Sequence, residues 1–255
     1  MAITKLSTTT WIAVGASGTV VTAPNINTWT VGSSGTAVDL RAITVANLGG
    51  GTYKALAVGR NGIGISSPNG TAWSSAISNT ATNPSGATVS LSDLNSVIYQ
   101  TFTPPGGSST SYYIITGDHG VVAISTNGTT WTTRTTQTLA DFQGIVYTGT
   151  YFFAVGDIGL TYVSSQDSNT FNVASEYYGT NPLSPNIIDI TTNGSYNIMG
   201  GQYGYLYHST GQFRFWRKYS TVLNSSIAAM NYLNSKYFSV GSSGQISYSS
   251  DGTIC

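Results

Sequence analysis

One pattern recurs six times along the sequence: an apolar run, the motif G-x-x-G, and an alternating run that ends in small polar residues. The clearest copy is "YFFAVGDIGLTYVSS", residues 151–165. The copies are spaced by 44, 58, 39, 45 and 40 residues, counted between the first glycines of the motif: Gly15, Gly59, Gly117, Gly156, Gly201 and Gly241. A repeat that runs from end to end constrains the fold strongly, because every copy must form the same small unit.

Each unit divides into four strand-like segments. In the fourth unit they are "FQGIVYTG", "YFFAVG", "GLTYVSS" and "FNVASE", rich in β-branched and aromatic residues and bounded by turn formers. Four antiparallel strands in about 40 residues are typical of a propeller blade. The sequence therefore predicts an all-β fold, a single six-bladed β-propeller domain over residues 1–255. Only "DGTIC" follows the last third strand, so the last blade is expected to be truncated at its outer strand.

The G-x-x-G motif predicts a tight hairpin between the second and third strands, with glycine supplying positive φ. Antiparallel alternation places this turn on the same face as the connection from strand four to the next unit. Residues on this face differ between units, which makes them candidate contacts for a partner or a glycan. They are Arg60, Asn61, Asp118, His119, Asp157, Gln202 and Tyr203, together with Tyr177 and Tyr178 in a long connection.

Three insertions exceed what the repeat needs. Ile77–Leu94 and Ser175–Asn186 are predicted to join the face that carries the hairpins, and Thr101–Ser111 the opposite face. A solvated spacer and a contact arm are both open for the Thr101–Ser111 segment.

A second signature follows the third strands. It reads "SSPNGTAW", "ISTNGTTW" and "SSDGT", with degenerate forms "TAPNINTW", "SSQDSNTF" and "STGQFRFW". The aromatic residue that closes it is expected to pack against its blade, and the positions are Trp29, Trp73, Trp131, Phe171 and Trp216. This signature resembles the Asp-box, or BNR repeat, of sialidase, photosystem II assembly-factor and phage-encoded propellers. The resemblance implies a structural turn and no particular activity.

Composition excludes several classes of protein. Charged residues make up 7% of the chain, against about 25% in ordinary soluble proteins, and nine basic residues balance nine acidic ones. We therefore expect no nucleic-acid partner and no membrane insertion. Cys255 is the only cysteine, which rules out an intrachain disulfide or a thiolate metal cluster. The N-terminal residues lack the apolar core of a secretory signal.

No catalytic group of residues emerges. Glu176 is the only glutamate, whereas most glycosidases need a pair of carboxylates, and "FRFW" differs from the "FRIP" of sialidases. His119 and His208 are the only histidines, and their spacing supplies no metal site. We therefore expect no enzymatic activity, no cofactor and no bound metal.

The leading hypothesis from these features is a non-enzymatic virion structural protein of a bacteriophage, a capsid decoration or a tail or fibre component. It would be made in the host cytoplasm without a signal peptide and located in the virion. Its partners would be other virion proteins in a symmetric assembly and, in host recognition, a host-surface glycan. Two alternatives remain open: a lectin-like propeller for carbohydrate binding, and an intracellular assembly factor similar to the photosystem II propellers.

Overall fold

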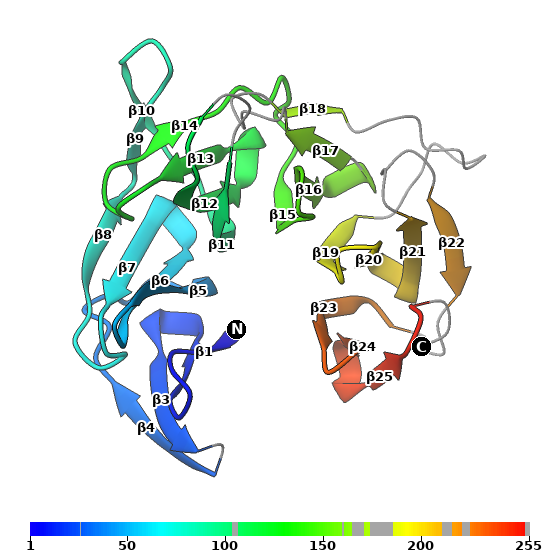
Figure 1. Cartoon of the computed structure of the whole chain (residues 1–255), viewed down its shortest axis with the longest axis horizontal. Helices are drawn as coiled ribbons and strands as arrows, with labels where there is room; N and C mark the ends of the chain where they lie inside the picture. The colour runs from blue at the N-terminus through cyan, green and yellow to red at the C-terminus, as the bar shows by residue number, and fades with distance from the viewer. Residues whose placement is uncertain are drawn as a thin grey trace. The chain divides into compact units, whose positions relative to one another are not determined.

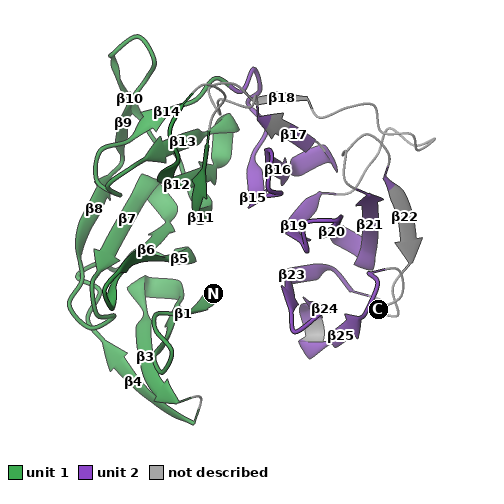
Figure 2. Ribbon diagram, viewed as in Figure 1, with its two compact units in different colours: residues 1–135 green, residues 136–255 purple. Residues whose placement is uncertain are grey.

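The computed structural model describes residues 1–25, 27–103, 107–159, 161–164, 171–173, 186–210, 216–220 and 225–252. Within these ranges the regular structure consists of strands and short 3-10 turns, with no α-helix, which confirms the all-β prediction. The chain falls into two compact units, Met1–Thr135 and Thr136–Cys255 (Figure 2). A single domain over residues 1–255 stays a prediction.

Unit 1 contains three sheets (Figure 1). Sheet 1 consists of β1 (Ala2–Lys5), β2 (Trp11–Val14), β3 (Val20–Asn25) and β4 (Thr28–Gly32). Sheet 2 consists of β5 (Leu40–Gly49), β6 (Thr52–Gly59), β7 (Ile63–Ser67) and β8 (Ser74–Ser78). Sheet 3 consists of β9 (Thr80–Thr82), β10 (Thr88–Ser90), β11 (Leu94–Phe102), β12 (Thr110–Gly117), β13 (Val122–Ser125) and β14 (Thr132–Thr133).

Unit 2 also contains three sheets. Sheet 4 consists of β15 (Phe142–Tyr147), β16 (Phe152–Gly156), β17 (Thr161–Ser164) and β18 (Phe171–Val173). Sheet 5 consists of β19 (Ile187–Thr192), β20 (Tyr196–Gly201), β21 (Tyr205–Thr210) and β22 (Arg217–Ser220). Sheet 6 consists of β23 (Ile227–Leu233), β24 (Lys236–Gly241) and β25 (Ile246–Ser249). Among the described residues this last sheet has three strands.

The cores lie between neighbouring sheets of each unit. In unit 1 the first strands β1, β5 and β11 are neighbours, and in unit 2 β15, β19 and β23 are. Sheets 2 and 5 have a neighbouring sheet on each face within their unit, and the last five residues of their second strands, β6 and β20, are all buried. Between sheets 5 and 6, for example, Ile198 and Leu206 pack against Ile227 and Met230.

The turns after the third strands of sheets 2, 3 and 6 share a hydrogen bond from a glycine N–H to a serine hydroxyl. In sheet 2 the Ser67 hydroxyl accepts from the Gly70 N–H at 2.8 Å, and the Asn69 side chain accepts from the next two N–H groups. Sheet 3 repeats this set with Ser125 and Asn127. In sheet 6 the Ser249 hydroxyl accepts from Gly252 at 2.9 Å. In these turns, side-chain oxygens accept hydrogen bonds from backbone N–H groups that have no partner on a neighbouring strand.

Sheet 3 departs from the prediction of four antiparallel strands. The Ile77–Leu94 insertion forms the β9–β10 hairpin, and β9 pairs in parallel with the outer strand β14. Ala81 and Leu91 anchor this hairpin in the core between sheets 2 and 3. The insertion therefore extends a sheet instead of remaining a loop, because its apolar residues find a core to enter. The Thr101–Ser111 insertion lengthens the β11–β12 pair, whose register continues to Phe102 and Thr110.

Candidate functional site

Five of the six hairpins, all but the one at Gly241, share the same backbone geometry in their last two residues. The first glycine of the motif is extended, with φ of −167° at Gly59, so any residue could adopt it. The second glycine lies in the left-handed region, with φ of +66° at Gly62, and the residue before it does too, with φ of +57° at Asn61. The positive φ expected of the motif therefore falls on its last two residues and not on its first glycine.

Close packing explains the first glycine in four copies of the motif, at Gly59, Gly117, Gly156 and Gly201. A Cβ on Gly59 would lie 1.9 Å from the carbonyl oxygen of Asp39, and one on Gly117 would lie 2.1 Å from that of Asp93. Asp39 and Asp93 each precede the first strand of their own sheet, and we call such a residue the lead-in residue. Because glycine has no side chain, the lead-in carbonyl can approach the hairpin. It then accepts a hydrogen bond from the N–H of the residue that follows the glycine.

The side chains of the lead-in residues reach the preceding sheet. Asp39 Oδ1 accepts from the Ser17 N–H of sheet 1 at 2.8 Å, and Asp93 Oδ1 accepts from the Asn61 N–H of sheet 2 at 2.9 Å. In unit 2, Asn186 Oδ1 accepts from the Ile158 N–H at 3.0 Å. Each lead-in residue therefore joins two neighbouring sheets at the hairpin ends.

The predicted contact residues of unit 1 lie in this network. Arg60 Nε is 3.3 Å from Asp39 Oδ2, with both side chains largely exposed. Asn61 is oriented by the bond from its N–H to Asp93. His119 Nδ1 shares a hydrogen bond of 3.1 Å with the Ser92 hydroxyl. The structure therefore fixes these residues on the surface that the alternation of strands predicted.

Asp118 ends a chain of polar contacts that crosses from sheet 2 to sheet 3. Arg41 Nη2 is 3.0 Å from Asp93 Oδ2, and another Arg41 nitrogen donates to Asn95 Oδ1. Asn95 Nδ2 then donates to Asp118 Oδ1 at 2.7 Å. We call the whole group the hairpin cluster: Asp39, Arg41, Arg60, Asp93, Asn95 and Asp118. It places two cations beside three carboxylates in a chain that is poor in charge.

The predicted residues of unit 2 form a looser set. Gln143 Nε2 lies 3.5 Å from Asp157 Oδ1, and the Gln202 N–H donates to the Asn186 carbonyl at 3.0 Å. Tyr203 is 72% exposed and stands edge-on to Tyr205. Tyr177 and Tyr178 lie outside the described residues, as does most of the Ser175–Asn186 insertion.

Sequence reasoning missed the lead-in aspartates and their partners Arg41 and Asn95. A signal was present, since "VDLRAI", "SDLNSV" and "ADFQGI" place an aspartate before the first strand of three units. The signal is short, and its meaning depends on a contact with a neighbouring sheet that periodicity does not reveal.

Unit 2 also contains a partly buried carboxylate. Asp189 Oδ2 accepts from the Met230 N–H at 2.6 Å and Oδ1 from the Ile190 N–H at 2.8 Å. Desolvation raises the pKa of Asp189 to about 6, and the two backbone hydrogen bonds, which favour the charged form, oppose this rise. The carboxylate links the first strands of sheets 5 and 6.

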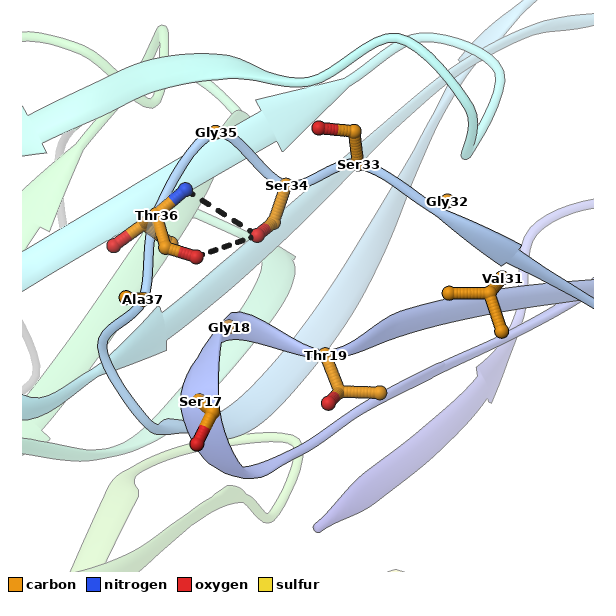
Figure 3. A pocket seen from close by; sticks show the side chains of 10 residues that line it. All are labelled: Ser17, Gly18, Thr19, Val31, Gly32, Ser33, Ser34, Gly35, Thr36 and Ala37. Carbon is orange, nitrogen blue, oxygen red and sulfur yellow. Dashed lines mark hydrogen bonds between the residues drawn. The ribbon is translucent and has the colours of Figure 1, made fainter.

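Two hollows adjoin the connector Ser33–Ala37 in unit 1. One, of about 490 Å³, lies between this connector and the turn Ser17–Thr19 (Figure 3). The other, of about 640 Å³, lies on the side of sheet 2 and reaches from Asn61 to Asn79. The wall between them is held by hydrogen bonds from the Ser34 hydroxyl to the Thr36 carbonyl, 3.0 Å, and from the Thr36 N–H to that hydroxyl, 3.3 Å.

Among the described residues, no three His, Cys, Asp or Glu side chains lie close enough together to hold a metal ion. The described part of the chain also has no helix long and apolar enough to cross a membrane.

Comparison with known proteins identifies the class of fold. No protein-family model and no curated protein matches the sequence. The structure of YCF48 bound to D1 peptide resembles this chain with a TM-score of 0.69 and 13% identity, covering 99% of this chain and 79% of that one. YCF48 from Cyanidioschyzon merolae resembles it with a TM-score of 0.68 and 12% identity, covering 100% and 83%. At these identities the likeness shows the fold alone, which is that of a β-propeller.

The same comparison corrects the leading functional hypothesis. YCF48 is a photosystem II assembly factor and not a virion component, so the predicted virion function and virion localisation are wrong. The error has a physical cause. The turn residues and the neutral polar surface are determined by folding and hydration, so they carry no information about the partner. Neither virion partners nor a glycan gains support, and the neighbours agree best with the assembly-factor alternative.

Proposed function

We propose that this chain is a non-enzymatic β-propeller that binds a segment of a partner protein, in the manner of an assembly factor. The observation that carries the proposal is the likeness over 99% of the chain to a propeller that is bound to a peptide. We also propose that each of the six sheets is one blade. The shared hydrogen bonds of the turns at Ser67, Ser125 and Ser249 support the resemblance to Asp-box repeats.

The geometry of unit 1 suits binding better than catalysis. In the hairpin cluster each cation lies beside a carboxylate, and hydrogen bonds hold the remaining polar groups. Such a network keeps side chains in fixed positions, which lowers the entropy lost when a partner binds. The variable residues Arg60, Asn61 and His119 stand on this fixed base, where differences between units can determine specificity.

A peptide-display selection tests the proposal. The full chain is immobilised and presented with a random library of 12-residue peptides, and enriched peptides are synthesised and titrated. We expect several unrelated peptides to bind with dissociation constants of about 10 μM or lower and to compete for one site. Heat-unfolded chain is the control and should bind none of them. Failure to enrich any peptide, or binding without mutual competition, would contradict a dedicated peptide site.

A further inference from the structure

The larger hollow of unit 1 is a groove along the outer strand of sheet 2. One wall is the connector at Ser34–Thr36, and the other is β8 with Ser74, Ser75 and Ser78. Its volume of about 640 Å³ lies within the roughly 300–1,000 Å³ range of ligand clefts. The groove begins beside Asn61, next to the hairpin cluster.

The strand edge that forms one wall is open. β8 is the last strand of its sheet and has no strand on its other side within the described residues. Just before β8, Ser33 pairs in parallel with Ala72 as an isolated bridge. The connector then leaves that edge, and the Ser34–Thr36 hydrogen bonds hold it away. At Ser33 the chain therefore adds a single residue in parallel to this edge. The next positions of the edge have no strand beside them within the described residues.

The chemistry of the groove differs from that of the hairpin cluster. Its floor is apolar, with Ile63, Ile65 and Trp73, and the Trp73 ring is held by the bond from Nε1 to the Gly70 carbonyl at 2.9 Å. Its rim offers hydroxyl and amide groups, among them Ser75 and Asn79, and no charged residue lines it. Such a surface favours an uncharged backbone with a bulky apolar side chain, because a charged ligand would lose hydration without finding a counter-charge.

We propose that this groove binds an extended, uncharged peptide segment, which adds in parallel to the free edge of β8 and places an apolar side chain against Trp73, Ile63 and Ile65. The proposal rests on the proposed function and specifies its site and its class of partner. Main-chain hydrogen bonds to β8 supply affinity, and the apolar floor supplies selectivity, as in other cases of β-augmentation. The parallel direction follows from the Ser33–Ala72 bridge, which the bound segment continues.

The peptides selected on the full chain provide the probe. We expect their sequences to be poor in charged residues and to share a bulky apolar position. On binding, the backbone amides of residues 74–78 should exchange with deuterium at least about ten times more slowly, while those of β4 should not change.

Two variants place a carboxylate on the exposed rim of the groove, Ser75→Glu and Ser78→Glu. Each should weaken peptide binding at least about tenfold without changing the melting transition. Thr30→Glu is the matched control, since Thr30 is exposed on the outer strand of sheet 1 and does not line the groove. It should bind as the unmodified chain does.

The outcomes separate this inference from the proposed function. Peptides that compete with one another but protect a segment other than β8, and bind the Ser75→Glu and Ser78→Glu variants normally, would overturn the groove and leave the function in place. Highly charged selected peptides would also overturn it. Absence of any peptide binding would overturn the proposed function itself.

Discussion

The two units join their sheets with carboxylates that have different partners. In unit 1 Asp93 lies partly exposed at the hairpin ends, where it contacts Arg41 and accepts from the Asn61 N–H. In unit 2 Asp189 is also partly buried, and it accepts from the backbone N–H groups of Met230 and Ile190. The contact between sheets is similar, but a cation stabilises the charge of Asp93, whereas peptide dipoles stabilise the charge of Asp189. Position in the repeat therefore decides what a residue touches, and burial decides its electrostatic cost.

The largest expected effect concerns a feature that the units share. Trp131 in unit 1 and Trp216 in unit 2 are 2% and 7% exposed and occupy equivalent positions of the sequence signature. Truncating either to Ala should lower the free energy of unfolding by about 3–5 kcal/mol, measured by chemical denaturation. Trp29, which is 37% exposed, is the control and should cost less than about 1 kcal/mol. Clearly unequal losses at Trp131 and Trp216 would show that the units differ in packing as well as in polar contacts.

The raised pKa of Asp189 predicts a specific dependence on pH. The pKa of Asp189 is about 6 in the folded chain against an ordinary value of 3.8, so the folded state binds the proton more readily. Stability should therefore rise as the pH falls from about 6 to about 4, by at most about 3 kcal/mol, because the carboxylate is only partly buried. Denaturation of Asp189→Asn across this range should lack this contribution, because the amide does not titrate. Parallel pH profiles for the two proteins would contradict a raised pKa.

Replacing the first glycine of the motif with alanine tests the close packing of the hairpins in both units. Gly117→Ala and Gly156→Ala place a Cβ 2.1 and 2.0 Å from a lead-in carbonyl, and each should cost about 2 kcal/mol of unfolding free energy. At Gly15 the nearest atom would be Met1 Cγ at 3.8 Å, so Gly15→Ala should be close to neutral. Denaturant titrations of the three variants measure the losses in unfolding free energy. An equal loss for Gly15→Ala would show that close packing with a lead-in carbonyl is not the cause of the losses at Gly117 and Gly156.

The smallest expected effect lies in the surface carboxylates. Asp93→Ala removes the Arg41 ion pair and the bond from the Asn61 N–H, and should cost about 1–2 kcal/mol. Asp39→Ala removes a more exposed pair with Arg60 and an exposed bond from the Ser17 N–H, and should cost less, about 0–1 kcal/mol. Thermal melting of the two variants at low and high salt compares their losses of stability, because salt screens exposed ion pairs. A larger loss for Asp39→Ala would show that exposure does not govern these contacts.

Much of the fold could be predicted from local patterns. Strands, hairpins and turns depend on residues close in sequence, so the alternation around Gly59 and the turn chemistry of Ser67 and Asn69 identify them. The extra β9–β10 hairpin could not be predicted in this way. Ala81 and Leu91 become core residues only because another part of sheet 3 lies beside them.

Strand alternation predicted Arg60, Asn61, Asp118 and His119 on one face, because it fixes the side on which each turn emerges. In the structure Asn61 and Asp118 are linked through Asp93, Arg41 and Asn95. The role of these residues as partner contacts stays a prediction. Asp93 was missed, since its role depends on Arg41 and Asn61, which are distant in sequence. The groove along β8 was missed for the same reason.

The sequence by itself determined the repeating unit: the order of strands, the place of each hairpin and the residues that close its turns. These features arise from backbone dihedrals and from hydrogen bonds within a few residues, which local sequence encodes directly. Only the tertiary structure decided why the first glycine is required at Gly59, Gly117, Gly156 and Gly201, what each lead-in aspartate binds, and that Asp93 meets a cation while Asp189 meets the backbone of the next sheet. Those outcomes depend on the sheet that lies next to each residue, because steric space, dielectric environment and counter-charges come from neighbours that are far away along the chain.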